Sequence, residues 1–337
     1  MRTLRYVTAD VFTSVPFSGN QLAVVFGADG LPTETLQAIT REFNYAESTF
    51  VLPAEDARTT RRVRIFTPEL EVPFAGHPTI GTAHVLVATG EVRADEVRAD
   101  EARADEARAG EVGARDGVAE DTMTVVLGEN VGPVPVAVRL EHGVPVHAQL
   151  TTAQLPEERT EVTDLDALAA VVGLTRDDLV GGNHLPVGAS CGLPFQIIPV
   201  RNAAAVSRAR LDQAMWRRVL DGTWAPWPMV FAMTREDDGA GLPDHVRGCD
   251  IRARVFVPGS TVPEDPATGS ANAALAGYLA ARTPRDGTLR WEVAQGIEMG
   301  RPSRLSIEAE KKQGTIAAVR VGGASVIMCE GTLTLRG

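Results

Sequence analysis

Two short turns, far apart in the sequence, most constrain how this chain can fold. Residues 74–81 read Phe-Ala-Gly-His-Pro-Thr-Ile-Gly, and residues 264–271 read Glu-Asp-Pro-Ala-Thr-Gly-Ser-Ala. Each turn combines Gly, Pro and polar side chains just ahead of small apolar residues, which is typical of a loop that enters a helix. A helix start exposes backbone N–H groups and the positive end of the helix dipole. Two such starts facing each other would bind a small anion, such as a carboxylate, from both sides.

The same order of predicted elements occurs twice along the chain. Strands lead into a turn, a helix of mostly small residues follows at 79–88 or 271–281, and further strands come after it. This repetition predicts an α/β protein of two similar domains, with the functional site between them. We expect the first domain to cover 1–127, together with 331–337, and the second to cover 128–330.

A five-residue repeat interrupts the first half. Residues 92–111 read VRADE, VRADE, ARADE and ARAGE. A period of five drifts by about 140° per repeat around an α-helix, so no continuous apolar stripe forms. The segment 91–117 is therefore predicted to be a low-complexity surface insertion, and a partner-binding arm is the alternative interpretation.

Charge and cysteine content exclude several classes of protein. The 337 residues carry a formal net charge of −11, which argues against nucleic acid or an anionic membrane as the main partner. The sequence contains no secretory signal pattern and no apolar run long enough to span a membrane. Three widely spaced cysteines form no CxxC pattern. We therefore expect a cytoplasmic protein without a disulfide framework.

Glu47 and His77 are the first candidates for chemistry. Glu47 lies in Asn-Tyr-Ala-Glu-Ser-Thr-Phe, and partly apolar surroundings would raise the pKa of its carboxyl toward the value that a proton shuttle needs. The alternative is an ordinary solvated loop glutamate. Pro78 is expected at the first helical position, which would leave His77 free to point into the site. The alternative is a structural histidine.

Asp265 and Ser270 in the second turn allow more than one interpretation. Both could act as helix caps. Together with His77 they could instead form a hydrolase triad, although the serine lacks the Gly-x-Ser-x-Gly elbow. His77 and His84 are about 10.5 Å apart along a helix, too far to share a metal, so a zinc site is not expected. The sequence contains no dinucleotide-binding or Walker motif, which predicts chemistry without a cofactor.

Several longer motifs resemble one known family. They are the Asp-Val-Phe-Thr-Ser-Val-Pro-Phe-Ser-Gly-Asn run at 10–20, the Glu47 segment, Arg-Ile-Phe-Thr-Pro at 64–68, the two turns, and Gln-Gly-Ile-Glu-Met-Gly-Arg-Pro-Ser at 295–303. In this order they resemble the PhzF family of phenazine-biosynthesis-like isomerases, across the whole chain except the repeat. The resemblance implies the diaminopimelate epimerase fold, in which two α/β domains each wrap a sheet around a central helix. It also implies a homodimer that acts on a small carboxylate.

The resemblance also implies roles for single residues. Glu47 would be the general acid/base, His77 and Asp265 would support it, and the substrate would be bound by Gly76, Gly269, Ser270 and Asn20. Related epimerases use one cysteine at each helix start, but both turns here lack cysteine, so racemisation by two thiols is not available. Ala46 and Tyr45 differ from the serine and the smaller apolar residue common in the family. A non-catalytic carboxylate-binding protein is the alternative function.

Overall fold

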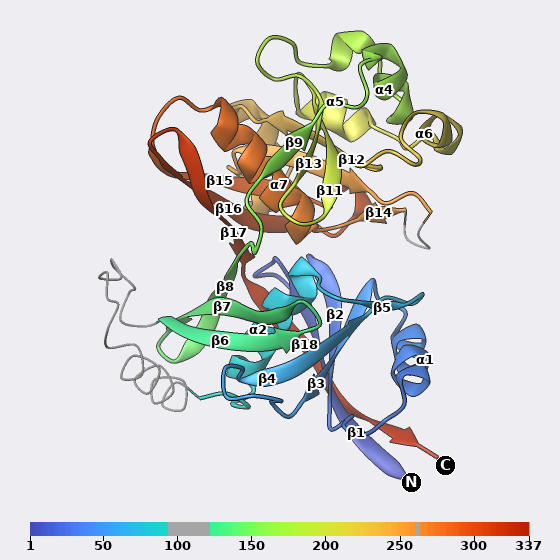
Figure 1. Cartoon of the computed structure of the whole chain (residues 1–337), viewed down its shortest axis with the longest axis vertical. Coiled ribbons are helices and arrows are strands. Elements are labelled where there is room, and N and C mark those ends of the chain that lie inside the picture. The colour runs from blue at the N-terminus through green and yellow to red at the C-terminus, as the bar shows by residue number, and fades with distance from the viewer. Residues whose placement is uncertain (94–121, 260–262, 337) are drawn as a thin grey trace. The chain divides into compact units, whose positions relative to one another are not determined.

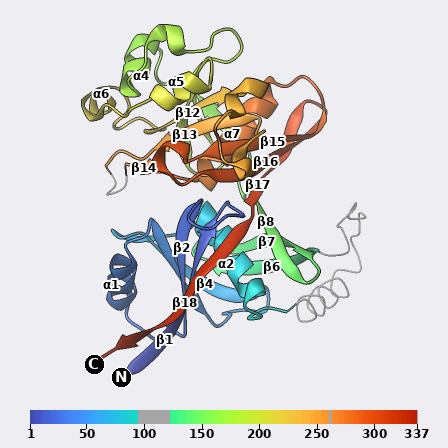
Figure 2. The ribbon, with the colours of Figure 1, turned by 180° about the vertical axis from the view of Figure 1, so that it is seen from behind.

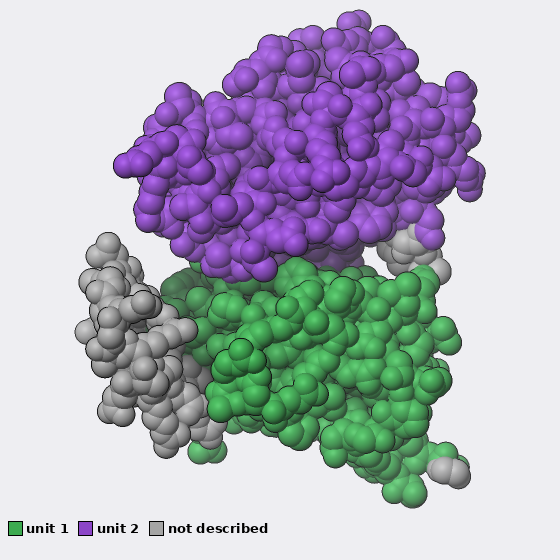
Figure 3. All heavy atoms as spheres, viewed as in Figure 1, with its two compact units in different colours: residues 1–11, 21–150, 323–337 green, residues 12–20, 151–322 purple. Residues whose placement is uncertain are grey.

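The computed structural model describes residues 1–93, 122–259 and 263–336. The chain divides into two compact units, coloured separately in Figure 3. Unit 1 comprises Met1–Val11, Gln21–Leu150 and Gly323–Gly337, and unit 2 comprises Phe12–Asn20 and Thr151–Gly322. The chain passes from unit 1 to unit 2 after Leu150. The domain boundary expected from the sequence lies after residue 127, and this boundary stays a prediction. The predicted insertion 91–117 lies outside the described residues from position 94 onward.

Unit 1 is a mixed sheet with a helix on each face (Figure 1). Its strands pair in the order β18, β1, β2, β3, β4, β6, β7, β8, and β5 is added beside β4. The elements of unit 1 are β1 (Arg2–Val11), β2 (Asn20–Phe26), α1 (Thr33–Phe43), β3 (Glu47–Leu52), β4 (Arg61–Phe66), β5 (Glu71–Val72), α2 (Gly76–Ala88), β6 (Thr122–Glu129), β7 (Gly132–Glu141), β8 (Val144–Thr151) and β18 (Ser325–Leu335).

Unit 2 has the same plan with more outer helices. Its strands pair in the order β9, β10, β11, β12, β13, β15, β16, β17, and β14 is added beside β13. The elements of unit 2 are β9 (Glu157–Arg159), α4 (Leu165–Val171), η1 (Arg176–Asp178), β10 (Val187–Ser190), β11 (Pro194–Pro199), α5 (Ala203–Arg208), α6 (Gln213–Val219), β12 (Trp227–Met233), η2 (Glu236–Gly239), η3 (Asp244–Val246), β13 (Ile251–Phe256), β14 (Glu264–Asp265), α7 (Gly269–Arg282), β15 (Gly287–Gln295), η4 (Ile297–Met299), β16 (Ser303–Lys312) and β17 (Thr315–Gly323).

The central helices α2 and α7 are buried on nearly all sides. Every residue of α2 from Gly76 to Leu86 is buried, and so are most residues of α7. Both sequences consist mostly of small and apolar residues, and a helix without a continuous polar face belongs in a core. Close approach requires glycine in each helix: a Cβ on Gly81 would come within 2.5 Å of Val11 Cγ2, and one on Gly277 within 2.6 Å of Pro156.

Outer helices cover the opposite face of each sheet. In unit 1, Leu36 and Ile39 of α1 pack on Phe50 and Phe66. In unit 2, a second buried cluster joins α4, α5 and α6 to strand residues such as Ile198. Each sheet therefore lies between a buried central helix and amphipathic outer helices, as the layered architecture of α/β domains requires.

The two units repeat one arrangement residue by residue. Phe66 lies opposite Glu71 between β4 and β5, and Phe256 lies opposite Glu264 between β13 and β14. In unit 1, Arg64 donates two hydrogen bonds to Glu71 at 2.9 and 2.6 Å. In unit 2, Arg254 donates two to Glu264 at 2.8 and 2.7 Å. Such bidentate pairs fix both the position and the orientation of a carboxylate.

Strand register extends this equivalence to the neighbouring strands. Arg62 lies opposite Gly128 in the parallel pair β4–β6, and Arg252 lies opposite Ala294 in the parallel pair β13–β15. Because the register matches, the next residues, Glu129 and Gln295, occupy equivalent positions in the two units.

The same comparison applies to the turns and to the helices that follow them. Val72 of unit 1 is equivalent to Asp265 of unit 2. Counted from the first residue of each helix, His77 is equivalent to Ser270, and Thr79 is equivalent to Asn272. The two units therefore share a backbone plan but place different side chains around their central helices.

The two ends of the chain lie side by side in unit 1. β1 pairs with β18 in antiparallel fashion from Arg2 opposite Leu335 to Val11 opposite Ser325. Figures 1 and 2 both show these strands together, one blue and one red.

Candidate functional site

The structure brings Glu47 and His77 together in unit 1. Glu47 is the first residue of β3, and His77 is the second residue of α2. Nδ1 of His77 lies 3.6 Å from Oε2 of Glu47, and their side chains are 5% and 20% exposed, respectively. The carboxylate thus keeps some access to solvent, while the imidazole is enclosed.

Burial keeps the His77 imidazole uncharged. Desolvation lowers the pKa of His77 to about 3, and a hydrogen bond with the backbone of Gln21 acts in the opposite direction. At neutral pH the imidazole beside Glu47 is therefore uncharged.

The helix start differs in one detail from the sequence-based expectation. We expected Pro78 at the first helical position, but α2 begins at Gly76, after the extended N-cap Ala75. Pro78 is consequently the third helical residue. Its missing N–H removes no helical hydrogen bond there, because the first turn has no intrahelical acceptors for its N–H groups.

Asn20 and Asp265 form the second pair, in unit 2. Nδ2 of Asn20 donates to Oδ1 of Asp265 at 2.8 Å and to the carbonyl of Ala267 at 3.1 Å. The hydroxyl of Thr268 donates to Oδ2 of Asp265 at 2.5 Å. Burial raises the pKa of Asp265, and the hydrogen bonds from Thr268, Asn20 and the Ala267 backbone counteract the rise.

The N-terminus of α7 begins directly after this loop. Gly269 and Ser270 are its first two residues, and Thr268 is the N-cap. The sequence left open whether Asp265 or Ser270 caps the helix; the structure places Asp265 in β14 and Ser270 inside the first turn. Among the described residues, neither N-cap residue of α2 and α7 makes a capping hydrogen bond through its side chain.

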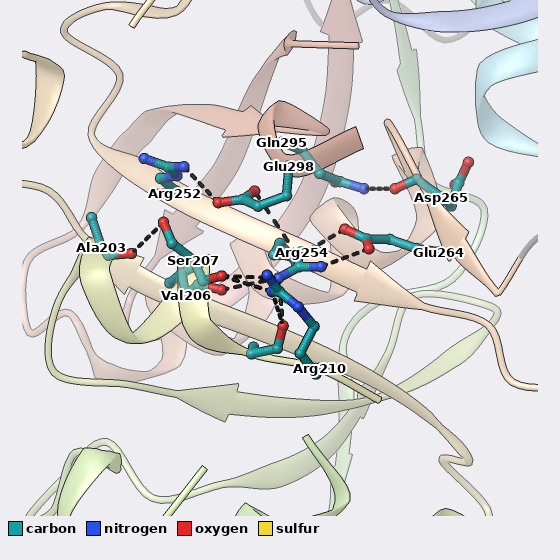
Figure 4. Close-up of polar contacts among 11 residues, drawn as sticks. Ala203, Val206, Ser207, Arg210, Arg252, Arg254, Glu264, Asp265, Gln295 and Glu298 are labelled. Atoms are coloured by element: carbon teal, nitrogen blue, oxygen red, sulfur yellow. Dashed lines mark hydrogen bonds and ion pairs between the residues drawn. The ribbon is translucent and has the colours of Figure 1, made fainter. Parts of the chain in front are cut away.

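An ion-pair network holds the strand that carries Asp265, as Figure 4 shows. Arg254 is 3% exposed and binds Glu264, the neighbour of Asp265, through two nitrogens. Its third nitrogen donates to the carbonyls at the end of α5, including that of Ala209. Glu298 accepts from Arg252 at 2.5 Å and lies 3.9 Å from Arg254. This anchoring fixes the short strand β14 on β13.

Sequence reasoning missed two buried polar residues behind the helix starts. Glu129 of β6 accepts a hydrogen bond from the hydroxyl of Thr79 at 2.6 Å. Desolvation raises the pKa of Glu129 to about 8, against the opposing effects of Thr79 and Arg62. Gln295 of β15 contacts the Asp265 loop. Gln295 begins the motif at 295–303 that carries the family resemblance, but the motif gave it no role, and Glu129 has no local sequence signal at all. Only strand register brings either residue to a helix start.

The described part of the chain offers no cluster of metal-binding side chains, and two of its three thiols have a raised pKa. Residues 1–93, 122–259 and 263–336 contain no group of three His, Cys, Asp or Glu side chains that could hold a metal ion. Burial raises the pKa of Cys191 to about 12 and that of Cys249 to about 11, so these two thiols remain protonated at neutral pH. None of the helices in these ranges is long and apolar enough to cross a bilayer.

Comparisons with known proteins agree with the architecture of the two units. Residues 9–331 match the family model described as phenazine biosynthesis-like protein. An uncharacterized isomerase of Mesorhizobium japonicum is 39% identical over 99% of both chains. Trans-2,3-dihydro-3-hydroxyanthranilate isomerase of Pseudomonas aeruginosa is 32% identical over 97% of this chain and 98% of that protein.

Solved structures extend the comparison to the fold. A PhzF-family phenazine biosynthesis protein of Bacillus anthracis superposes with a TM-score of 0.79 at 22% identity, over 99% of this chain and 100% of that one. A hydroxyproline epimerase of Agrobacterium vitis reaches a TM-score of 0.54 at 14% identity, over 98% and 92% of the chains. The predicted diaminopimelate epimerase-like fold is confirmed.

Proposed function

The chain belongs to the phenazine biosynthesis-like (PhzF) family of isomerases, and on that premise we propose that it moves a proton within a small unsaturated or α-acidic carboxylate without a cofactor. Glu47 is the general acid/base. It takes a proton from a carbon beside an electron-withdrawing group and returns it elsewhere on the same face of the substrate.

The contact between Glu47 and a neutral His77 carries this proposal. An imidazolium 3.6 Å away would hold Glu47 ionised and weaken it as a base. The buried imidazole, with its pKa lowered to about 3, stays uncharged, so it adds no positive charge beside the Glu47 carboxyl. His77 can then orient a polar substituent of the substrate.

Asp265 and the helix starts bind the substrate in this proposal. The carboxylate of Asp265, oriented by Asn20 and Thr268, accepts from a donor group of the substrate. Backbone N–H groups at Gly76 and Gly269 receive the substrate carboxylate, with which the positive ends of the helix dipoles interact favourably.

The substrate class follows from the residues around Glu47 and from the relatives. A relative named trans-2,3-dihydro-3-hydroxyanthranilate isomerase suggests a cyclic unsaturated carboxylate. Tyr45, whose ring lies 6.1 Å from that of Phe43, and Ala46 flank the base and distinguish this chain from the common family pattern. We therefore propose a related carboxylate as the natural substrate.

A racemase that uses two thiols is not a competing proposal. The equivalent positions at the two helix starts hold His77 and Ser270, and Cys191 lies elsewhere, 3.5 Å from the Ala273 carbonyl. A hydrolase triad of Ser270, His77 and Asp265 is also less favoured, because both Asp265 oxygens already accept hydrogen bonds from Asn20 and Thr268.

The assembly and location follow from other features. We propose a homodimer by the family resemblance, which light scattering of the purified protein tests. The three cysteines, all free in the structure, support a reducing compartment such as the cytoplasm.

Solvent deuterium uptake tests the function directly. The protein is incubated in D₂O with a panel of unsaturated and α-acidic carboxylates, including trans-2,3-dihydro-3-hydroxyanthranilate, and C–H exchange is followed by NMR. At least one member should acquire deuterium with wild type, and Glu47→Gln should slow exchange by at least about 10²-fold. Full exchange by Glu47→Gln would remove Glu47 from the mechanism.

Two further outcomes would decide for the alternatives. Binding of panel members without any C–H exchange supports a non-catalytic carboxylate-binding protein. Covalent labelling of Ser270 by a fluorophosphonate supports a hydrolase.

A further inference from the structure

Behind the Asp265 loop lies a buried chain of amide side chains. Gln295, the last residue of β15, and Asn272, on the first turns of α7, are both 0% exposed. Nε2 of Gln295 donates to the carbonyl of Asp265 at 2.8 Å and to the hydroxyl of Thr268 at 3.1 Å. Oε1 of Gln295 accepts from Nδ2 of Asn272 at 2.8 Å. Figure 4 shows the contact between Gln295 and Asp265.

Two backbone carbonyls fix the direction of the hydrogen bonds made by Gln295 and Asn272. A carbonyl oxygen can only accept, so the Asp265 carbonyl requires the NH₂ group of Gln295 on its side. The Thr268 carbonyl, which accepts from Nδ2 of Asn272 at 2.9 Å, likewise orients Asn272. The oxygen of Gln295 must then face the NH₂ group of Asn272, as observed.

The orientation of Gln295 also fixes the hydrogen bond that the Asp265 carboxylate receives from Thr268. The Thr268 hydroxyl accepts from Gln295 and has only one proton to donate. That proton is directed to Oδ2 of Asp265. With Asn20 donating to Oδ1, both carboxylate oxygens receive hydrogen bonds, which favours the ionised form.

The equivalent position in unit 1 shows that this is a specific arrangement. There Glu129 accepts from Thr79, the residue equivalent to Asn272, just as Gln295 accepts from Asn272. A glutamate has no N–H group in either protonation state, and a protonated carboxyl can donate only one O–H hydrogen bond. Gln295 donates to both the Asp265 carbonyl and the Thr268 hydroxyl while it accepts from Asn272, which requires an amide at this position.

We propose that Gln295 is a positioning residue for the site. It acts through Thr268 to direct a proton donor at Asp265 and to hold the start of α7 against the Asp265 loop. The inference rests on the proposed function only in the role given to Asp265.

Among the described residues, Glu264 is the charged group that shifts the pKa of Asp265. Glu264 precedes it on β14 and raises its pKa by repulsion, but Glu264 is bound by Arg254 of the adjoining β13. Glu298 interacts with Arg252 and lies near Arg254. Gln295, Thr268 and Asn20 are uncharged, and the hydrogen bonds from Thr268, Asn20 and the Ala267 backbone oppose the rise in the pKa of Asp265 that burial causes.

Direct titration of Asp265 tests the proposal without any substrate. Protein labelled with ¹³C at the aspartate carboxyls is titrated by NMR, and Asp265→Asn assigns the signal. Thr268→Val, which keeps the shape and removes the donor, should raise the pKa of Asp265 by roughly one to two units. Thr268→Ser, which keeps the hydroxyl, should titrate like wild type.

Gln295→Met provides the decisive variant. It keeps the side-chain volume but removes both donors, and we expect the pKa of Asp265 to rise by on the order of half a unit. The backbone amides of Thr268 and Gly269 should also exchange faster in D₂O. Glu129→Gln, in the other unit, should leave the Asp265 titration unchanged.

The outcomes separate this inference from the proposed function. An unchanged Asp265 pKa and unchanged amide exchange in Gln295→Met would overturn the positioning role. Should that variant not fold, an unshifted pKa in the isosteric Thr268→Val overturns it instead. If Glu47→Gln keeps full C–H exchange while Asp265 titrates as expected, the proposed mechanism fails and the positioning role stands.

Discussion

Replacing Glu129 by Gln should change how the stability of unit 1 depends on pH. Glu129 is 5% exposed, and among the described residues its Oε2 has no hydrogen-bond partner. Its pKa rises from 4.5 to about 8 through desolvation. The folded protein therefore binds a proton that the unfolded chain releases above about pH 4.5.

The difference between the folded and unfolded pKa values of Glu129 sets the sign and the size of the change in unfolding free energy with pH. A group with a raised folded-state pKa contributes most below its unfolded pKa, and its contribution is lost as the pH rises through the folded value. At about 1.36 kcal/mol per pKa unit, the wild type should lose about 4 kcal/mol between about pH 5 and about pH 8.5 through this group alone. Glu129→Gln removes that loss. The variant should also lose about 1–3 kcal/mol of stability at every pH, because the amide N–H group of the new glutamine is buried without a hydrogen-bond acceptor.

Urea unfolding at several pH values measures the effect. All four tryptophans lie in unit 2, so their fluorescence reports on that unit, while hydrogen exchange of α2 peptides reports on unit 1. The difference in unfolding free energy between variant and wild type should move in favour of the variant by about 4 kcal/mol from about pH 5 to about pH 8.5. Glu55→Gln, at a side chain that is 74% exposed, is the matched control and should show no such trend.

One result would refute this reasoning. If the free-energy difference between Glu129→Gln and wild type is the same at both ends of the range, Glu129 does not bind a proton on folding. Its buried carboxyl would then be ionised, and the desolvation argument would be wrong.

Four further predictions test other parts of the molecule. Glu47→Asp, which withdraws the carboxylate by one methylene, should lower C–H exchange by at least about 10-fold while thermal unfolding stays near wild type, and unchanged exchange would contradict a positioned base. Gly81→Ala should destabilise the fold by about 1–3 kcal/mol, measured by urea unfolding, because the new Cβ meets Val11 at 2.5 Å. Arg254→Met should cost about 3–5 kcal/mol by leaving the largely buried Glu264 carboxylate unpaired, and much of this should return in the double variant with Glu264→Gln; no recovery would speak against the ion pair as the cause. Burial lowers the pKa of His84 from 6.5 to about 4, so its contribution is complete above about pH 6.5 and lost as the pH falls through about 4, and His84→Gln should flatten acid unfolding in that range by up to about 3 kcal/mol.

Local patterns in the sequence predicted the elements on which the candidate site is built. The small-residue runs at 79–88 and 271–281 became the buried helices α2 and α7, whose observed starts are two or three residues earlier. The observed helices start earlier than expected because Pro78 and Ser270 fit in the first turn of a helix, where the N–H groups have no intrahelical acceptor. The local surroundings of Glu47 left a solvated loop glutamate as the alternative, and its acid/base role came from the family resemblance and stays a prediction.

Longer-range relationships could not be predicted from local patterns. The hydrogen bond between Asn20 and Asp265 joins residues 245 positions apart, and the segment that carries Asn20 belongs to unit 2 although β1 and most of β2 belong to unit 1. The positions of Gln295 and Glu129 behind the helix starts follow only from strand register. Their polar atoms find hydrogen-bond partners on segments that are distant in the sequence. Local patterns in a single sequence do not show these partners.

Pairing of β1 with β18 determines the order in which this protein can be completed during synthesis. Domains commonly fold from the N-terminal end as the chain leaves the ribosome. Here β1, the first strand to be synthesised, can pair with β18 (Ser325–Leu335) only at the end of synthesis. Every strand of unit 2 has been translated by then. The C-terminal half can thus reach its final structure before the N-terminal half closes its sheet, and a stop codon only a dozen residues early would leave β1 with an open edge.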